Sequence, residues 1–357
     1  MLSAREAVRT MPTYHPPLAG RDGLRLDFNE NTVGCSPNVL ERLRGLSAEE
    51  LARYPEREPV EKQVADFLGV SHTELLLTNG VDEAIHLLCE TYLEPGDEAI
   101  ISVPTYSMYR IYMAAAGARV FNVPAGSGFA FPTSQIIDHI SERTRLIAIA
   151  NPNNPTGTVA SSGDSLRVAK AATNAAVLVD EAYFEFYGKS MLEQRKEASN
   201  LFVARTFSKA YGLAGLRVGA LIGGEEQMRA IRRVCSPYNV NAVALACLPE
   251  AITDQNYIRR YVNEVLEGRA RLVAALEALG VEYWKSEANF VLVRVGSASF
   301  VESMRRRGIL VRDRSGDPGC DGCVRITIGL SKQTDQMLSA LRESLDEIGM
   351  RQGALRP

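Results

Sequence analysis

The chain has 357 residues, of which 46% are hydrophobic and 23% charged, as in an ordinary globular protein. The formal net charge of −3 gives no indication of nucleic-acid binding, and no apolar run is long enough to predict a membrane span. The first residues contain no apolar segment of the kind found in secretory signals. We therefore expect a cytoplasmic protein that binds neither nucleic acid nor membrane.

The N-terminal residues, 1–28, contain several prolines and glycines and are expected to form an arm. After the arm, short apolar runs end in loops rich in Asn, Pro, Gly and Asp. These runs are residues 98–105, 145–151, 175–180 and 200–205. Stretches of helical composition, such as 161–176, lie between them, so the alternation predicts parallel βαβ units with helices on both faces of the sheet. In such sheets, ligands bind beyond the carboxyl ends of the strands.

The pattern changes after about Pro237. Residues 256–279 repeat apolar side chains at helical spacing, which predicts a long amphipathic helix. Three further apolar runs follow, at residues 290–296, 308–313 and 324–330. The sequence therefore predicts a large domain at 29–236 and a smaller α/β domain at 237–357.

The six cysteines are scattered along the chain, so a disulfide framework is not expected. Cys320 and Cys323 have the CxxC spacing that redox pairs and zinc sites use. No second CxxC accompanies them and the four histidines are dispersed, so no metal site is expected. A turn that carries two thiols is the interpretation we prefer.

The segment ARTFSKAYGLAGLRVG, residues 204–219, places Lys209 just after an apolar run. A lysine amine is a nucleophile only when it is neutral, and burial or nearby cations favour the neutral form. The hydroxyls of Thr206 and Ser208 and the guanidinium of Arg217 are suited to binding a phosphate. The alternative is a solvated basic loop.

Three other segments add polar groups at the ends of predicted strands. In TNGVDEAI, residues 78–85, Gly80 allows a tight turn into a helix whose first N–H groups can bind an anion. The Pro-rich loop NPNNPTG, 151–157, can hold the amide of Asn154 in place. In VDEAY, Asp180 ends an apolar strand and is expected to be buried with a partner, although capping the next helix is an alternative.

Together these motifs resemble the pyridoxal-phosphate aminotransferases of the aspartate-aminotransferase fold group, and most of all the histidinol-phosphate aminotransferases. The resemblance covers nearly the whole chain in order. Its further motifs are DFNEN (27–31), YP (54–55), PTYSMY (104–109), LVRD (310–313) and VRITIG (324–329). It implies a fold-type I α/β protein, in which a mostly parallel seven-stranded sheet lies between helices and a smaller α/β domain follows. It also implies the cofactor pyridoxal 5′-phosphate.

The resemblance assigns roles around this cofactor. Lys209 would hold it as a Schiff base and shuttle a proton, and Asp180 would pair with its protonated ring nitrogen. Asn154 and Tyr183 would hydrogen-bond the ring hydroxyl oxygen, and Tyr106 would stack on the ring. The groups implied at the phosphate are Gly80, Val81, Asp82, Thr206, Ser208 and Arg217. Tyr54 would reach the cofactor phosphate of a neighbouring subunit, so a homodimer is expected.

For the substrate, Arg325 matches the arginine that binds the α-carboxylate of glutamate, and its alternative is a surface strand residue. Arg312 would face the substrate beside it, because a phosphate ester favours two guanidinium groups over one. Tyr14 matches an arm tyrosine that closes over the site, although it could simply pack the arm on the body. Asn29 is expected near the substrate. The implied reaction is histidinol phosphate plus 2-oxoglutarate to imidazole-acetol phosphate plus glutamate, in histidine biosynthesis.

Other functions stay open at this point. Thr32 and Cys35 stand where the family often has prolines, which leaves the fine specificity undecided. Aromatic-amino-acid aminotransferases and threonine-phosphate decarboxylases share nearly all of these motifs. A pyridoxal-phosphate-binding protein without turnover is disfavoured, because Lys209, Asp180 and Tyr183 are all present.

Overall fold

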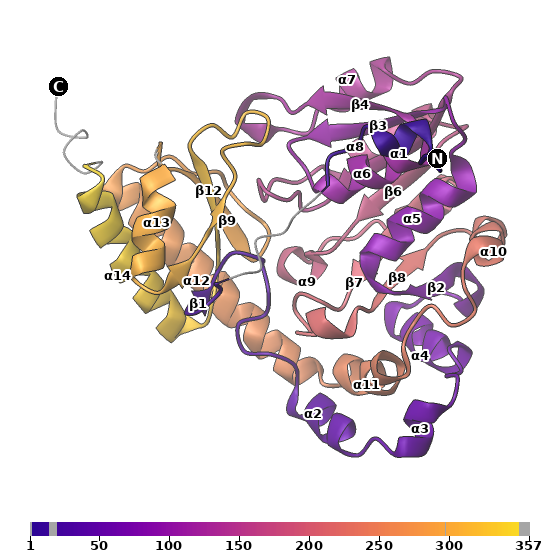
Figure 1. Cartoon of the computed structure of the whole chain (residues 1–357), viewed down its shortest axis with the longest axis horizontal. Coiled ribbons are helices and arrows are strands. Elements are labelled where there is room, and N and C mark those ends of the chain that lie inside the picture. Colours follow the sequence, from indigo (N-terminus) through magenta and orange to yellow (C-terminus); the bar gives the residue numbers. More distant parts are fainter. Residues whose placement is uncertain (1, 14–19, 297, 350–357) are drawn as a thin grey trace.

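The computed structural model describes residues 2–13, 20–296 and 298–349. Its main sheet has seven strands in the order β2-β8-β7-β6-β5-β3-β4 (Figure 1). Strand β8 runs antiparallel to β2 and β7, whereas the other paired strands run parallel. The expected mostly parallel, seven-stranded sheet is therefore confirmed. The strands are β2 (Leu75–Thr78), β3 (Glu98–Val103), β4 (Arg119–Pro124), β5 (Thr144–Ala150), β6 (Ala176–Asp180), β7 (Leu201–Thr206) and β8 (Gly219–Ile222).

The sheet is buried on both faces because successive side chains of a strand point in opposite directions. Along β5, Leu146 and Ala148 belong to one hydrophobic cluster, and Ile147 and Ile149 belong to another. The first cluster includes side chains of α5, α6 and α10, and the second includes side chains of α7 and α8. These helices are α5 (Gly80–Tyr92), α6 (Ser107–Ala116), α7 (Thr133–Asp138), α8 (Ser162–Ala171) and α10 (Glu225–Val234). Uninterrupted apolar strands are thus explained by helices on both faces.

A smaller antiparallel sheet follows in the order β11-β12-β9. The helices α12, α13 and α14 lie beside it (Figure 1). Its elements are β9 (Phe290–Arg294), β10 (Ile309–Leu310), β11 (Arg312–Asp313), β12 (Cys323–Thr327), α12 (Gln255–Leu279), α13 (Ala298–Arg306) and α14 (Ser331–Glu347). Strand β1 (Leu24–Arg25) pairs in parallel with β10, and Thr327 N–H donates to the Leu26 carbonyl at 2.9 Å. The DFNEN motif, which follows directly, is thereby attached to this smaller sheet.

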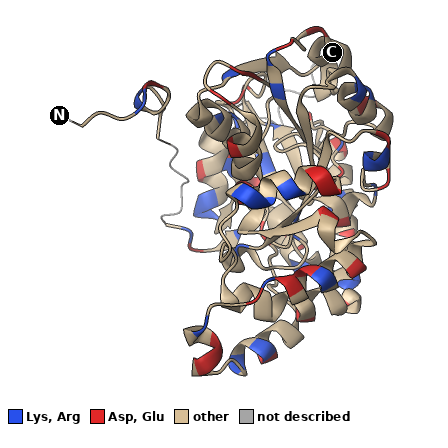
Figure 2. Cartoon of the chain, turned by 90° about the vertical axis from the view of Figure 1, so that its right-hand side faces the viewer, with Lys and Arg blue, Asp and Glu red and all other residues tan. Residues whose placement is uncertain are grey.

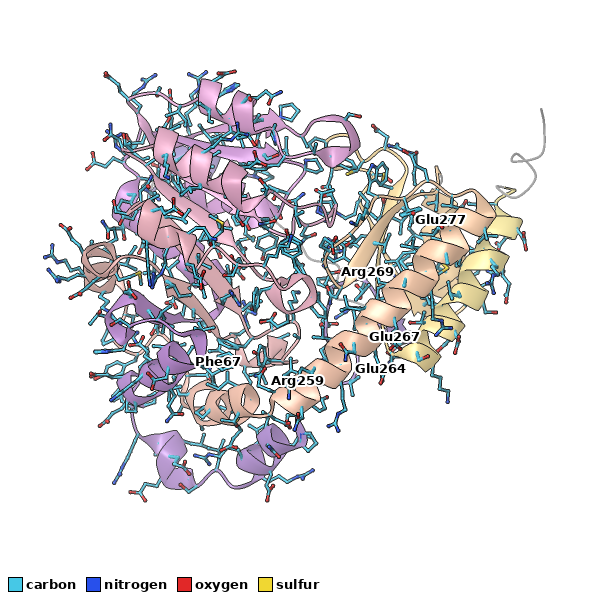
Figure 3. All side chains as sticks on the ribbon, turned by 180° about the vertical axis from the view of Figure 1, so that it is seen from behind. Phe67, Arg259, Glu264, Glu267, Arg269 and Glu277 are labelled. Carbon is cyan, nitrogen blue, oxygen red and sulfur yellow. The ribbon has the colours of Figure 1, made fainter. Side chains whose placement is uncertain are left out.

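The long helix α12 runs across the back of the molecule in Figure 3. It begins after Asp254, whose side chain accepts a hydrogen bond from Tyr257 N–H, and ends at Gly280, whose φ of +66° suits glycine. Arg259, Glu264 and Glu267 are polar residues along this helix. Its other face buries Tyr261, Val265 and Leu272 in the core, which explains the predicted helical periodicity.

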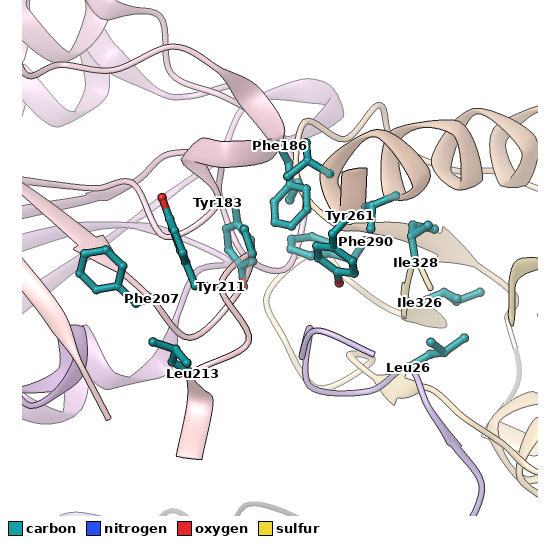
Figure 4. Packing of buried hydrophobic residues seen from close by; sticks show 14 of the residues in the cluster. Leu26, Tyr183, Phe186, Phe207, Tyr211, Leu213, Tyr261, Phe290, Ile326 and Ile328 are labelled. Carbon is teal, nitrogen blue, oxygen red and sulfur yellow. The ribbon is translucent and has the colours of Figure 1, made fainter. Parts of the chain in front are cut away.

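The chain has six further α-helices among the described residues. They are α1 (Glu6–Arg9), α2 (Pro37–Arg44), α3 (Ala48–Ala52), α4 (Glu58–Leu68), α9 (Phe184–Tyr187) and α11 (Ala242–Thr253). One continuous hydrophobic cluster joins the two sheets: Tyr183 lies between Phe207 on one side and Phe290 and Ile326 on the other (Figure 4). This shared core holds the strands that carry the polar motifs at a fixed distance from one another.

In Figure 2, Lys and Arg positions and Asp and Glu positions are interspersed along the ribbon. Within the described residues, no helix has both the length and the apolar composition needed to cross a bilayer.

Candidate active site

A cavity of about 210 Å³ lies beyond the carboxyl ends of β5, β6 and β7. Parallel sheets bind their ligands at this edge, and the predicted motifs meet there. The cavity is lined by Phe28, Glu30, Val81, Asp82, Tyr106, Tyr109, Ala150, Pro152, Asn154, Asp180, Ala182, Tyr183, Thr206, Ser208, Lys209, Ala214 and Arg217. Segments that lie far apart in the sequence thus form one site.

Lys209 reaches this cavity from the loop after β7, and its Nζ donates a hydrogen bond to the Phe28 carbonyl at 3.1 Å. Burial, helped by the positive charges of Arg325 and Arg217, lowers the pKa of Lys209 from its usual 10.5 to about 8. Near neutral pH, a larger fraction of the Lys209 amine is therefore neutral than for an exposed lysine. The solvated-loop alternative does not describe Lys209, whose amine reacts best in this neutral form.

Asp180 is the last residue of β6 and is buried. Its Oδ1 accepts a hydrogen bond from Ala182 N–H at 3.1 Å, and its Oδ2 accepts one from the Tyr109 hydroxyl at 2.6 Å. Burial raises the pKa of Asp180 to about 6, while these two hydrogen bonds lower it. Helix α9 has Tyr183 at its N-cap position, so Asp180 does not cap that helix.

Groups suited to a phosphate lie at and beside the start of α5. Helix α5 starts at Gly80, and the Asn79 side chain does not cap it, so the first N–H groups remain available. Gly80 has a φ of +75°, and a Cβ there would lie 2.5 Å from Arg217 Nη2. Only glycine allows the guanidinium to approach the helix start this closely. Arg217 Nη2 is 3.1 Å from Asp82 Oδ2.

Thr206 and Ser208 also line the cavity. The Thr206 Oγ1 accepts a hydrogen bond from Ser208 N–H at 3.1 Å, so the Thr206 hydroxyl can still donate its own proton. Tyr106 lies at the cavity wall, where its hydroxyl donates to Asp82 Oδ1 at 2.8 Å. Its ring meets the Tyr109 ring edge-on at 5.6 Å between centroids.

Tyr183 and Asn154, which also line the cavity, offer two hydrogen-bond donors. The Tyr183 hydroxyl accepts from Asn29 Nδ2 at 2.9 Å, so its own proton is free to donate. The Asn154 Oδ1 accepts from Arg325 Nη1 at 2.5 Å, which turns the Asn154 amide hydrogens into the available donors. An oxyanion of a ring would be stabilised by this pair.

Arg312 and Arg325 are direct cross-strand partners between β11 and β12, so both side chains lie on one face of the small sheet. Arg325 is buried, and its Nη2 donates to the Asp27 carbonyl at 2.6 Å. The Arg312 guanidinium lies over the Phe28 ring at 5.2 Å. Considering only the described part of the chain, Arg312 Nη1 and Arg325 Nε are buried without a hydrogen-bond partner. Burial lowers the pKa of Arg325 to about 10.

Among the described residues, five predicted site residues do not line the cavity themselves: Gly80, Arg312, Arg325, Asn29 and Tyr54. Tyr54 is 78% exposed and stacks on Tyr238, with ring centroids 4.3 Å apart, outside the cavity. Asn29 is buried with a φ of +56° and binds Tyr183 and Thr327 through its side chain. The predicted Tyr14 lies outside the described residues.

Tyr109, Phe28 and Glu30 also line the cavity, although no role was predicted for them. Tyr109 is the last residue of the PTYSMY motif, and Phe28 and Glu30 belong to the DFNEN motif. Their positions inside those motifs were therefore the signal that could have identified them.

These residues fit pyridoxal 5′-phosphate. The donor set at the start of α5, closed by Arg217 above Gly80, suits a phosphate dianion. Asp180 suits a protonated ring nitrogen, Asn154 and Tyr183 suit the ring oxygen, and the Lys209 amine suits the aldehyde. The arrangement would hold a flat, charged ring with each of its polar groups paired.

Comparison with known proteins agrees with this site and places the chain among aminotransferases. The profile of the family "Aminotransferase class I and II" matches residues 21–341. A histidinol-phosphate aminotransferase of Moorella thermoacetica is 34% identical, over 96% of this chain and 92% of that protein. One of Geobacillus sp. is 34% identical, over 97% and 99%. A crystal structure of the Sinorhizobium meliloti histidinol-phosphate aminotransferase in complex with pyridoxal-5′-phosphate shares the fold, with a TM-score of 0.87 over 96% of this chain and 98% of that one, at 24% identity.

Proposed function

Because the chain belongs to the class I and II aminotransferase family, we propose that it transfers the amino group of histidinol phosphate to 2-oxoglutarate. The products are imidazole-acetol phosphate and glutamate, and the reaction is a step of histidine biosynthesis. The cofactor is pyridoxal 5′-phosphate. The fold of the chain is that of the fold-type I transferases.

The cross-strand pair of Arg312 and Arg325 is the observation from which we infer the amino donor. Two guanidinium groups on one face, each with a buried unpartnered N–H among the described residues, favour a phosphate dianion over a single carboxylate. An aromatic amino acid would leave one of these donors desolvated and unsatisfied, which costs binding free energy. The same pair can bind the two carboxylates of glutamate in the second half-reaction.

The residues of the cavity perform distinct tasks in this mechanism. When bound, the cofactor supplies the electron sink that makes the donor's Cα proton acidic. The neutral Lys209 amine accepts that proton, and its pKa of about 8 suits both accepting and returning it. Asp180 holds the proton on the ring nitrogen, and the donors on Asn154 and Tyr183 stabilise charge on the ring oxygen.

A homodimer is part of this proposal. Exposed apolar side chains occur on the segments before, on and after α2 and α3, at Val33, Leu40, Leu51 and Tyr54, and Tyr54 stacks on the exposed Tyr238. Burying such a surface against a second copy stabilises the assembly, and Tyr54 would then face the partner's phosphate site. This position explains why Tyr54 lies outside the cavity of its own subunit. A cytoplasmic location and the proposed division into an arm, a large and a small domain stay predictions.

The test is a side-by-side donor panel with the purified, cofactor-loaded protein. Histidinol phosphate, phenylalanine, tyrosine and threonine phosphate are each supplied with 2-oxoglutarate, and glutamate and carbon dioxide are quantified. The proposal predicts that kcat/KM is highest for histidinol phosphate by at least about tenfold, since the second charge-assisted contact is worth about that factor. Higher kcat/KM for phenylalanine or tyrosine, or carbon dioxide release from threonine phosphate, would reject the proposed donor.

A further inference from the structure

The mechanism above gives no task to Tyr109, although its side chain contacts the most buried acid of the site. Tyr109 lies on α6 and is fully buried, and its hydroxyl donates to Asp180 Oδ2 at 2.6 Å. We propose that Tyr109 is a positioning residue for the cofactor: its hydroxyl keeps Asp180 ionised and oriented, and so keeps the proton on the ring nitrogen. The inference rests on the cofactor of the proposed function and not on the choice of amino donor.

The geometry around Asp180 is that of a carboxylate fixed at both oxygens. Ala182 N–H binds Oδ1 at 3.1 Å and the Tyr109 hydroxyl binds Oδ2 at 2.6 Å. An ionised carboxylate has about four lone-pair sites, so each oxygen keeps one site for the N–H of the ring. Two donors from different elements prevent rotation of the carboxylate, because α6 supplies one and the loop after β6 supplies the other. The Asp180 carboxylate is thereby already oriented when the cofactor ring arrives.

The electrostatic surroundings of Asp180 make this donor necessary. Burial raises the pKa of Asp180 to about 6. The negative charges of Asp82 on α5 and of Glu181, the residue that follows Asp180, raise this pKa too. The hydrogen bond from Tyr109 opposes these effects, followed by the one from Ala182. Without the Tyr109 hydroxyl, the carboxylate would take up a proton at a pH closer to neutrality. A protonated Asp180 no longer stabilises a protonated ring nitrogen.

Tyr109 is itself suited to donate over the whole working pH range. Burial and the nearby Asp180 raise the pKa of Tyr109 well above its ordinary value, so the hydroxyl keeps its proton. One turn earlier on the same side of the cavity, Tyr106 donates to Asp82 at 2.8 Å, and burial raises its pKa in the same way. Helix α6 and its N-cap residue therefore supply two neutral tyrosine donors, one to each of these carboxylates.

The test uses Tyr109→Phe, which removes the hydroxyl and keeps the ring that packs in the core. The matched control is Tyr92→Phe, a partly buried tyrosine that packs against the same hydrophobic cluster. Each protein is loaded with cofactor enriched in 15N at the ring nitrogen. We expect the 15N resonance of Tyr109→Phe to move toward the unprotonated position, with kcat about ten- to hundredfold lower and KM changed by less than about threefold. Tyr92→Phe should match the parent protein in all three quantities.

A double-mutant cycle with Asp180→Asn separates this role from simple packing. Cofactor affinity and the 15N shift are measured for the parent, both single variants and the double variant. Tyr109→Phe should weaken cofactor binding in the parent and change neither quantity by much in the Asp180→Asn background, because no ionised carboxylate remains there to be stabilised. Three outcomes would overturn the inference. Tyr109→Phe could weaken cofactor binding equally in both backgrounds, or it could leave the 15N shift unchanged. The third outcome is a Tyr109→Phe protein that fails to fold while Tyr92→Phe folds. If the parent protein binds no cofactor at all, the proposed function fails instead.

Discussion

Arg325 Nη1 lies 2.5 Å from Asn154 Oδ1, which joins β12 of the small sheet to the loop after β5 of the large sheet. The guanidinium thus holds the oxygen of the Asn154 amide, and Asn154 lines the cavity. In the proposed function, a substrate anion bound by Arg325 would be coupled through this hydrogen bond to the amide that is proposed to contact the cofactor ring.

Arg325→Lys keeps the charge and removes the planar fork. We expect kcat/KM for the amino donor to fall about 100-fold, because two charge-assisted hydrogen bonds are lost together. Arg294→Lys is the matched control, since Arg294 is on the neighbouring strand β9 and binds Glu282 away from the cavity. Steady-state kinetics of both variants measures the difference. A change below about threefold for Arg325→Lys would show that its fork does not bind the substrate.

The reactivity of Lys209 should depend on pH with an unusual midpoint. Its pKa is lowered to about 8, so the amine is protonated and unreactive below this pH and neutral above it. Acetylation of the apo protein at a series of pH values, followed by mass spectrometry of the Lys209 peptide, should give a midpoint near 8. Arg325→Leu removes a positive neighbour and should raise that midpoint. In urea-unfolded protein the same peptide should titrate near the ordinary lysine value, and equal folded and unfolded midpoints would contradict the account.

The ion pair between Arg205 and Glu181 predicts a large effect on stability. Arg205 Nε lies 2.8 Å from Glu181 Oε2, and the two side chains are 5% and 1% exposed. Arg205→Met leaves a buried carboxylate unpaired, so the free energy of unfolding should fall by about 3–5 kcal/mol in urea titrations.

The pair of Arg229 and Glu225 provides the control, because these side chains are 66% and 59% exposed. Arg229→Met should change the free energy of unfolding by less than about 1 kcal/mol. Adding Glu181→Leu to Arg205→Met should recover part of the lost stability, since the Glu181 carboxylate is then no longer buried without its partner. If Arg205→Met and Arg229→Met lower the free energy of unfolding equally, the buried ion pair contributes no more to stability than the exposed one.

The proposed dimer predicts complementation between two impaired subunits. Lys209→Ala should be inactive, and Tyr54→Ala should bind cofactor weakly because the partner's phosphate contact is lost. In a refolded equimolar mixture, half of the dimers are mixed, and one of their two sites has both Lys209 and the partner's Tyr54. Activity should therefore return to about a quarter of the parent value. Mixtures no more active than the separate variants would contradict a site shared between subunits.

Much of the fold was predictable because the strands of the large sheet are apolar on both faces. The expected runs at 98–105 and 175–180 contain β3 and β6, and Asp180 at the end of β6 lines the cavity. Strand β4 was not expected, since it lies at the sheet edge and its burial pattern is mostly exposed or intermediate. The other edge strand, β2, is fully buried, so the weak apolar signal of β4 comes from the exposure of its own side chains.

The contacts that join distant segments could not be read from the sequence. Asn29 was expected near the substrate, but its binding to Tyr183 depends on a left-handed backbone and on the pairing of β1 with β10. Tyr109 was quoted within a motif without a role, because only the tertiary placement of α6 brings its hydroxyl to Asp180. Cys320 and Cys323 are both buried beside Leu292, as thiols of a turn. Sequence patterns identify such residues, whereas tertiary packing decides what they touch.

The most direct measurement of the central claim is reduction of the cofactor-loaded protein with borohydride, followed by proteolysis and mass spectrometry. The account predicts one peptide that carries the mass of the reduced pyridoxal adduct, and it contains Lys209. Lys209→Ala treated in parallel should remain folded, retain no adduct at that peptide and show no turnover. An adduct on another lysine, or no adduct in protein that has been given excess cofactor, would contradict the role of Lys209 and the active site built around it.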